Sequence, residues 1–359
     1  PGALLGLHGN NKSDDEIGLA LDEGFGQIIV DSLGEIDRVA DLAAVRGVIA
    51  PVLLRLVTGV HAGGHEYIST AHEDQKFGLS VTPPRDGGDS PAMEALLRIL
   101  ARPSLRLLGL HSHIGSQILE VEGFAVAARA VLQLRSDLAG RTGYLMEEVD
   151  LGGGYGIAYL PGEPTLDPRQ VATSIAAAVG HTCADLGTPV PRISIEPGRS
   201  IVGPAGMTLY TVGAVKPVTV AGEASQSGDG ATGDDGAEPF QRLYVAVDGG
   251  MSDNIRPALY QAVYHAELAN RVSSAPLVRA RIVGKHCESG DILIHDIDLP
   301  SDIGAGDLIA IAATGAYGRS MASNYNLLAR PPVIAVRDGE TRVLLRRETV
   351  ADLLALDEG

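Results

Sequence analysis

Short apolar runs alternate with amphipathic stretches over the first two hundred residues of this chain. The apolar runs lie at 27–30, 52–56, 105–110, 148–151 and 192–195, and the amphipathic stretches at 14–23, 35–45, 92–101, 121–138 and 168–186. The first pattern is typical of buried strands and the second of helices with one apolar face. Their alternation predicts a parallel sheet covered by helices.

Polar or glycine-rich clusters follow nearly every one of these runs. They are Asp31-Ser32, Arg55, His111-Ser112-His113, Gly152-Gly153-Gly154 and Glu196-Pro197-Gly198-Arg199. Chemically active residues at successive strand ends are typical of a (β/α)8 TIM barrel. A Rossmann sheet gives similar alternation but gathers its polar loops at one crevice, so the barrel is favoured.

The pattern changes near residue 206, where β-rich runs follow one another without long helices between them. These runs lie at 208–215, 243–247, 278–283, 307–313 and 332–335, and a last helix is predicted at 348–356. We therefore predict two domains, a partial TIM-barrel cofactor-binding domain at 1–205 and an antiparallel β-domain at 206–359. Residues 221–239, rich in glycine and acidic side chains, read as a flexible surface loop.

Composition narrows the functional classes. The chain has 359 residues, 45% of them hydrophobic, and a net charge of −17, so nucleic acid and anionic membranes are poor partners. No apolar run is long enough to span a membrane. With only two cysteines there is no disulfide framework, and a reducing, cytoplasmic setting is expected.

Three of the strand-end clusters have plain structural alternatives. The glycine run at 152–156 suits close approach of backbone N–H groups to a phosphate, but a tight turn is about equally plausible. For His111 a hydrogen-bonded core histidine is favoured. His111 and His113 lack an obvious third ligand, so no metal site is predicted. Glu196 could hold a protonated pyridine nitrogen and Arg199 a phosphate; the alternative is a structural ion pair.

Three further groups lie in the second half of the chain. Arg256 and Tyr260 are one helical turn apart and could hold one carboxylate together; the alternative is a solvated turn. Cys287 lies among charged and polar residues in KHCESGD, which favours a proton-transfer role over a buried small side chain. Tyr317 occupies a glycine-rich loop, where it could reach a phosphate or pack in a turn.

In order and spacing, these motifs closely resemble the diaminopimelate decarboxylase family, pyridoxal-phosphate enzymes with a TIM barrel and a β-domain. The resemblance runs from about His8 to the C-terminus through HGNNKS, HEDQKFG, GLHSHIGSQ, VDLGGGYGI, IEPGRS, VDGGMSDNIRPALY, KHCESGDIL and TGAYGRSMASNYN. The combination of HSHIGSQ, EPGRS and CESGD is highly specific.

The resemblance implies a role for each candidate residue. Its cofactor-binding residues would be Ser116, Gly152, Gly153, Gly154, Glu196, Pro197, Gly198, Arg199 and Tyr317. Its substrate-binding residues would be Arg199, Arg256, Tyr260, Glu288 and Tyr317. Of the two catalytic residues, His113 would stack on the pyridine ring and Cys287 would return a proton after CO2 leaves.

The implied reaction is the decarboxylation of meso-2,6-diaminopimelate to L-lysine, the last step of lysine biosynthesis. The resemblance also implies a homodimer in which Cys287 and Glu288 reach the partner's active site. The substrate has a second amino-acid end, which a distal clamp of Arg256, Tyr260 and Glu288 would hold. The alternatives are a decarboxylase of ornithine, arginine or carboxynorspermidine, and a non-catalytic homologue.

Two departures from the family pattern stand out. The family attaches its cofactor through a lysine in a YAxKA-like strand upstream of HGNNK, whereas the four lysines here are Lys12, Lys76, Lys216 and Lys285. We therefore expect the chain to lack the first strand–helix units of the barrel, and alone to fold poorly and be inactive. Arg319 stands where the family often has an aromatic residue, so the resemblance leaves the shape of the pocket rim open but not the core assignment.

Overall fold

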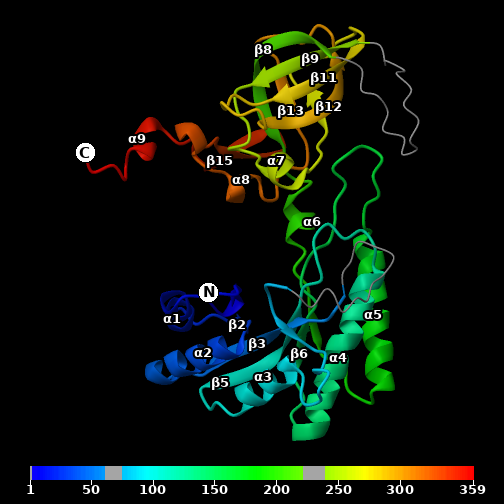
Figure 1. The fold of residues 1–359 in the computed structure, drawn as a ribbon, viewed down its shortest axis with the longest axis vertical. Coiled ribbons are helices and arrows are strands. Elements are labelled where there is room, and N and C mark those ends of the chain that lie inside the picture. Colours follow the sequence, from blue (N-terminus) through cyan, green and yellow to red (C-terminus); the bar gives the residue numbers. More distant parts are fainter. Residues whose placement is uncertain (1, 61–74, 221–238) are drawn as a thin grey trace. The chain divides into compact units, whose positions relative to one another are not determined.

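Strands and helices alternate through the first two hundred residues of the computed structural model, which describes residues 2–60, 75–220 and 239–359 (Figure 1). After a 3-10 turn at Gly2–Leu4, the order is β1 (Gly6–Leu7), α1 (Asp14–Asp22), β2 (Gln27–Val30), α2 (Leu33–Arg46), β3 (Ala50–Val57), β4 (Leu79–Ser80), α3 (Pro91–Leu100), β5 (Leu105–Ser112), α4 (Glu122–Thr142), β6 (Glu148–Asp150), α5 (Pro168–Asp185), β7 (Arg192–Ser194) and α6 (Gly198–Val202). The predicted strands and helices of this half are confirmed.

All strands of this sheet run parallel. Their order is β1-β2-β3-β5-β6-β7, and β4 pairs with β3. Helices α2, α3 and α4 contact β3 or β5, and their apolar faces close a core around buried side chains such as Ile36, Val52, Leu96 and Leu110. This is the barrel-type arrangement of parallel strands and outer helices that the alternation predicts. In the strand order, β1 and β7 form the two ends of the sheet.

Local sequence signals explain where the helices begin and end. The side chain of Ser13 accepts a hydrogen bond from Glu16 N, and Glu16 returns one to the backbone of Ser13, which makes a capping box for α1. Ser32 caps α2, which ends at Gly47 in the left-handed conformation (φ 66°). In α3, Ser90 provides the cap and Pro91 the first helical residue.

The second half is built from strands, as predicted. Its elements are β8 (Thr208–Val220), β9 (Phe240–Val247), α7 (Arg256–Tyr260), β10 (Ala266–Leu268), β11 (Leu277–Val283), β12 (Ile292–Pro300), β13 (Leu308–Ile311), α8 (Gly318–Met321), the 3-10 turn Tyr325–Leu327, β14 (Val333–Arg337), β15 (Glu340–Leu345) and α9 (Val350–Leu353). Six strands form one sheet in the order β10-β13-β8-β9-β11-β12, and β14 pairs with β15.

Several details of this half differ from the sequence prediction, which gave no strand at the positions of β10, β12 and β15. The sheet is mixed, because β9 and β11 run parallel while its other neighbouring pairs are antiparallel. The last helix is shorter than predicted, because only Val350–Leu353 is helical and Thr349 caps it. The predicted loop at 221–239 lies, apart from Pro239, outside the described residues, as do the first three residues of HEDQKFG.

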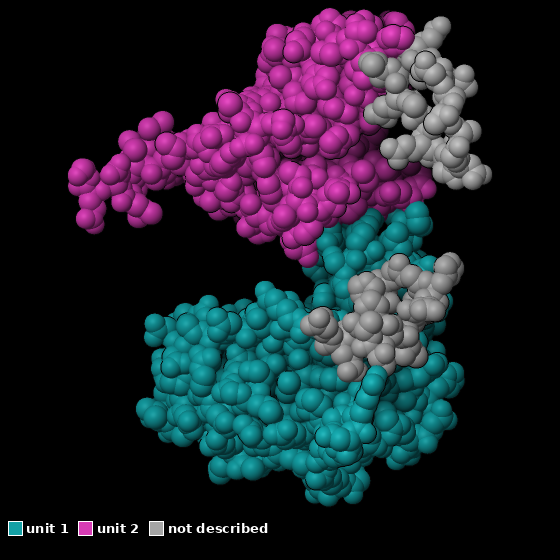
Figure 2. Space-filling model, viewed as in Figure 1, with its two compact units in different colours: residues 1–157, 164–200 teal, residues 158–163, 201–359 magenta. Residues whose placement is uncertain are grey.

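The chain folds into two compact units, residues 1–157 with 164–200 and residues 158–163 with 201–359 (Figure 2). Each is described by itself below. No helix within the described ranges has both the length and the apolar character that a membrane span needs.

A buried ion pair joins β1's loop to α2 in the first unit. Lys12 and Glu35 are 2% and 4% exposed, their charged groups are 3.0 Å apart, and Lys12 Nζ also donates to the Ile29 carbonyl at 2.8 Å. Lys12→Met is expected to lower the free energy of unfolding by about 3 kcal/mol, because Glu35 keeps a buried charge without its cation. Urea unfolding of the intact gene product measures this.

The double variant Lys12→Met, Glu35→Gln is the matched control. It removes both charges, and the glutamine oxygen still accepts the hydrogen bond that Asp31 N gives to Glu35 at 2.8 Å. Most of the lost stability should return. Equal instability of the single and double variants would contradict an electrostatic origin.

Candidate active site

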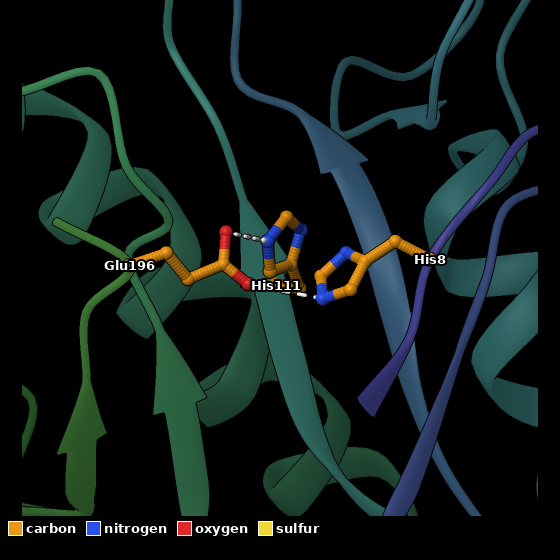
Figure 3. A group of neighbouring side chains, drawn as sticks. All are labelled: His8, His111 and Glu196. Atoms are coloured by element: carbon orange, nitrogen blue, oxygen red, sulfur yellow. Dashed lines mark hydrogen bonds and ion pairs between the residues drawn. The ribbon is translucent and has the colours of Figure 1, made fainter. Parts of the chain in front are cut away.

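Three polar side chains from separate strand ends meet in the first unit (Figure 3). His8 follows β1, His111 lies near the end of β5, and Glu196 follows β7. The Nε2 atom of His8 is 3.0 Å from Glu196 Oε1, and that of His111 is 3.3 Å from Glu196 Oε2. The two imidazole rings meet edge to face with centroids 5.1 Å apart. Parallel strands bring their carboxyl ends to one edge of a sheet, and His8 and Glu196 meet there although β1 and β7 end the strand order, so the sheet curves as in a barrel.

The two imidazoles keep the Glu196 carboxylate ionised. Burial of this group disfavours its charge, but hydrogen bonds from His111 and His8 outweigh that effect and hold its pKa well below the usual range. At the end of β6, burial raises the pKa of Asp150 against the attraction of His111, and the charge of Glu196 adds to the rise. This edge of the sheet thus carries the ionised carboxylate of Glu196 and that of Asp150, which takes up a proton more readily.

His113 presents a neutral ring beside this cluster. Burial lowers its pKa, and the positive charge of Arg55 lowers it further. The N–H of Gly153 donates to its Nδ1 atom at 3.1 Å, so the ring proton lies on Nε2. The hydrogen bond fixes the ring to the glycine loop, and a neutral imidazole is a flat ring of the kind that stacks on aromatic ligands.

The glycine run 152–154 lies against neighbouring backbone. A Cβ atom at Gly152 would be 2.3 Å from the Ser112 carbonyl oxygen, and one at Gly154 would be 2.3 Å from that of Gly115. Gly152 and Gly154 also have φ values of +67° and +102°, which side-chain-bearing residues rarely adopt. The loop therefore needs glycine, because a side chain at Gly152 or Gly154 would collide with neighbouring backbone.

Ser116 and Arg199 come together although they are far apart in the sequence. The Arg199 guanidinium donates to Ser116 Oγ at 2.7 Å. Gly198 starts the short α6, and its N–H donates to the Glu196 carbonyl at 2.9 Å, so Pro197 and Gly198 turn the chain between the carboxylate and the guanidinium. A guanidinium beside a hydroxyl is a donor pair that suits a phosphate.

These groups fit pyridoxal phosphate. An ionised carboxylate suits its protonated pyridine nitrogen, a neutral imidazole suits its ring, and the glycine run with Ser116 and Arg199 suits its phosphate. His111 Nδ1 and Ser112 Oγ are among the buried polar atoms of the described residues that lack a hydrogen-bond partner, and a bound ligand or water would supply one. His8, His111 and Glu196 are also metal-ligand types, but they bond to one another, and the absence of a metal stays a prediction.

In the second unit, α7 carries the two residues whose spacing predicted a shared ligand. The Arg256 guanidinium is buried, donates to Tyr264 Oη, and lies 5.0 Å from the centre of the Tyr159 ring. Tyr260 is 61% exposed. Residues four apart on a helix lie on one face, but among the described residues no hydrogen bond joins Arg256 to Tyr260. Their shared role stays a prediction.

Cys287 and Glu288 lie in the turn between β11 and β12. Cys287 is a free, exposed cysteine, and the side chain of Glu288 accepts a hydrogen bond from Tyr325 Oη. The neighbouring His286 uses both ring nitrogens on Ser252 and Asn326, and the described residues show no hydrogen bond from it to Cys287. Tyr317, with φ +67° and 44% exposure, directly precedes α8.

Sequence reasoning gave no role to His8 or Tyr325. Both occur in motifs that carried the resemblance, HGNNKS and SNYN, but their partners are remote in the sequence. For His8, the available signal was its position just after a parallel strand, where a polar residue is typical of an active site. No signal in the sequence pointed to Tyr325.

Comparison with known proteins gives concordant matches. A family model described as "Pyridoxal-dependent decarboxylase, pyridoxal binding domain" matches residues 5–203. Diaminopimelate decarboxylases from Mycobacterium bovis and Bacillus subtilis are 49% and 43% identical, over 99% of this chain and 76% and 75% of their own lengths. The structure of diaminopimelate decarboxylase from M. jannaschii with L-lysine has a TM-score of 0.83 at 31% identity, over 98% of this chain and 74% of that one.

Proposed function

This chain belongs to the pyridoxal-dependent decarboxylase family that contains the diaminopimelate decarboxylases, and from this premise we propose that it converts meso-2,6-diaminopimelate to L-lysine and CO2. The observation that carries the proposal is the Glu196 carboxylate, held ionised by His8 and His111 beside the His113 ring. Pyridoxal phosphate, when bound, accepts the electron pair left by the departing carboxylate group.

Residues of the first unit would hold this cofactor. Glu196 would keep the pyridine nitrogen protonated, and His113 would stack on the ring. Ser116, Arg199 and the backbone of the glycine run would bind the phosphate. Pro197 and Gly198 would keep the turn between Glu196 and Arg199 in place. Each of these groups is held by its own hydrogen bonds, so little reorganisation is needed on binding.

Apart from Arg199, which lies in the first unit, the residues that would hold the substrate and return the proton lie in the second unit. The substrate carries a carboxylate and an ammonium at its distal end, and Arg256 with Tyr260 suits the first while Glu288 suits the second. Arg199 and Tyr317 would contact both substrate and cofactor. The Cys287 thiol would donate its proton to the carbon that has lost CO2, and solvent would restore the proton once the product has left the site.

The chemistry of the substrate favours this family member over decarboxylases of simpler amino acids. The substrates ornithine and arginine have no distal carboxylate. With either of them bound, the buried side chain of Arg256 would have no anionic group to contact. We further propose a cytoplasmic homodimer. Both cysteines are free, which suits a reducing compartment.

The direct test is release of CO2 by the purified product of the intact gene with pyridoxal phosphate. We expect turnover of meso-diaminopimelate and at least about 100-fold lower kcat/KM for ornithine and arginine. Turnover of ornithine or arginine in preference to diaminopimelate would overturn the substrate assignment. Cofactor binding with no turnover of any of them would support a non-catalytic homologue.

Mixed dimers test whether active sites are shared between subunits. Glu196→Gln and Cys287→Ala chains are each expected to be nearly inactive alone. Co-expressed, they should recover about one quarter of the wild-type activity, because half of the dimers are mixed and each mixed dimer has one intact site. A mixture no more active than its components would show that each chain supplies both residues to its own site.

A further inference from the structure

Tyr325 joins two segments of the second unit that are far apart in the sequence. It begins the 3-10 turn Tyr325–Leu327, whereas Glu288 lies in the turn between β11 and β12. Its hydroxyl donates to Glu288 Oε1. In the described part of the chain, the second carboxylate oxygen of Glu288 has no hydrogen-bond or ion-pair partner. One oxygen is thus tied to the protein and the other remains open to a ligand.

A buried histidine supports the Tyr325 ring. The ring of His286 stacks on that of Tyr325, with centroids 5.3 Å apart and 30° between the planes. His286 is 8% exposed; its Nε2 atom is 2.9 Å from Ser252 Oγ, and its Nδ1 atom is 3.1 Å from Oδ1 of Asn326, the residue after Tyr325. His286 N also donates to Asp291 Oδ2 at 2.8 Å. The histidine therefore fixes both the Glu288 turn and the Tyr325 segment.

We propose that Tyr325 is a positioning residue that orients the Glu288 carboxylate toward the distal ammonium of the substrate, with His286 as its support. The inference rests on the proposed function. It adds a reason for selectivity toward substrates with a distal ammonium, because a carboxylate held by one oxygen presents the other oxygen in a fixed direction.

The physical basis is the freedom of an exposed glutamate. An unrestrained glutamate side chain must lose rotamer freedom each time it binds a cation, whereas Tyr325 fixes it in advance. The hydrogen bond to Glu288, together with burial, raises the pKa of the Tyr325 hydroxyl, so the phenol stays protonated and keeps donating.

Tyr325→Phe tests the proposal, because it removes the hydroxyl and keeps the ring that stacks on His286. We expect the KM for meso-diaminopimelate to rise about tenfold with kcat within about twofold of wild type. Competitive inhibition by 2-aminopimelate, which lacks only the distal ammonium, should be unchanged. An unchanged KM, or equal weakening of both ligands, would overturn the proposal.

A second background separates orientation of Glu288 from general packing. In a Glu288→Ala protein there is no carboxylate to orient, so adding Tyr325→Phe should change kcat/KM by less than about twofold. A further tenfold loss would show that Tyr325 acts by another route and would refute the inference. Wild-type turnover of diaminopimelate in the same series shows that the proposed function itself stands, and its absence would count against that function instead.

Discussion

Replacing Glu196 with glutamine is expected to lower kcat for decarboxylation by about 10²- to 10³-fold. Glutamine has nearly the same shape but no charge, so it cannot keep a pyridine nitrogen protonated. The wild-type carboxylate stays ionised although it is partly buried, because His8 and His111 both bond to it and hold its pKa far below the usual range. The loss should therefore appear in kcat.

Two measurements separate this effect from misfolding. Affinity for pyridoxal phosphate, measured by equilibrium dialysis of the apo-protein, should fall by about tenfold or more, because one charged contact is lost. Asp89→Asn is the control: it removes one negative charge from an exposed ion pair with Arg141 in the same unit and should leave kcat unchanged. A Glu196→Gln protein that keeps kcat within threefold of wild type would refute the assignment.

Elements that depend on local sequence were predictable. The run at 27–30 is β2 at the predicted bounds, because its apolar residues are buried between neighbouring strands. The helices were found because their apolar faces and their caps, such as Ser32 and Ser90, lie within a few residues of one another. The shift from alternating to β-rich pattern was visible for the same reason.

Features set by distant partners were not predictable. The parallel pairing of β9 with β11 depends on where two separate strands meet in the sheet, and neither strand differs in composition from an antiparallel one. β15 was not predicted from the sequence. None of its residues is buried, so it lacks the apolar face that marks a strand packed on a core. Likewise, nothing near His8 indicates Glu196, and nothing near Glu288 indicates Tyr325.

The individual site residues were therefore found with uneven success. His111 illustrates the limit: a buried histidine was predicted, and it is buried, but its bond to Glu196 makes it part of the candidate site. The resemblance supplied residue types at each position. It could not supply the hydrogen bonds that give Glu196 its charge or restrain Glu288, since these come from the folded backbone.

Replacing Cys287 with alanine is expected to lower kcat by about 10²- to 10⁴-fold, the usual contribution of a positioned general acid. The thiol is exposed in the β11–β12 turn, where it can exchange its proton with solvent after each turnover. Alanine removes the proton donor while disturbing little packing. Cys183→Ala is the matched control, because Cys183 is buried in α5 and has no place in the proposed chemistry.

The stereochemistry of the product distinguishes proton donation from a structural role. In D2O, wild-type enzyme should place deuterium in one configuration at the carbon that lost CO2, since a fixed donor delivers it to one face. In the Cys287→Ala protein, water would protonate that carbon from both faces, and a mixture of configurations should form. Slow turnover that keeps a single configuration would assign the proton to another residue, and Cys287 would then serve only to shape the site.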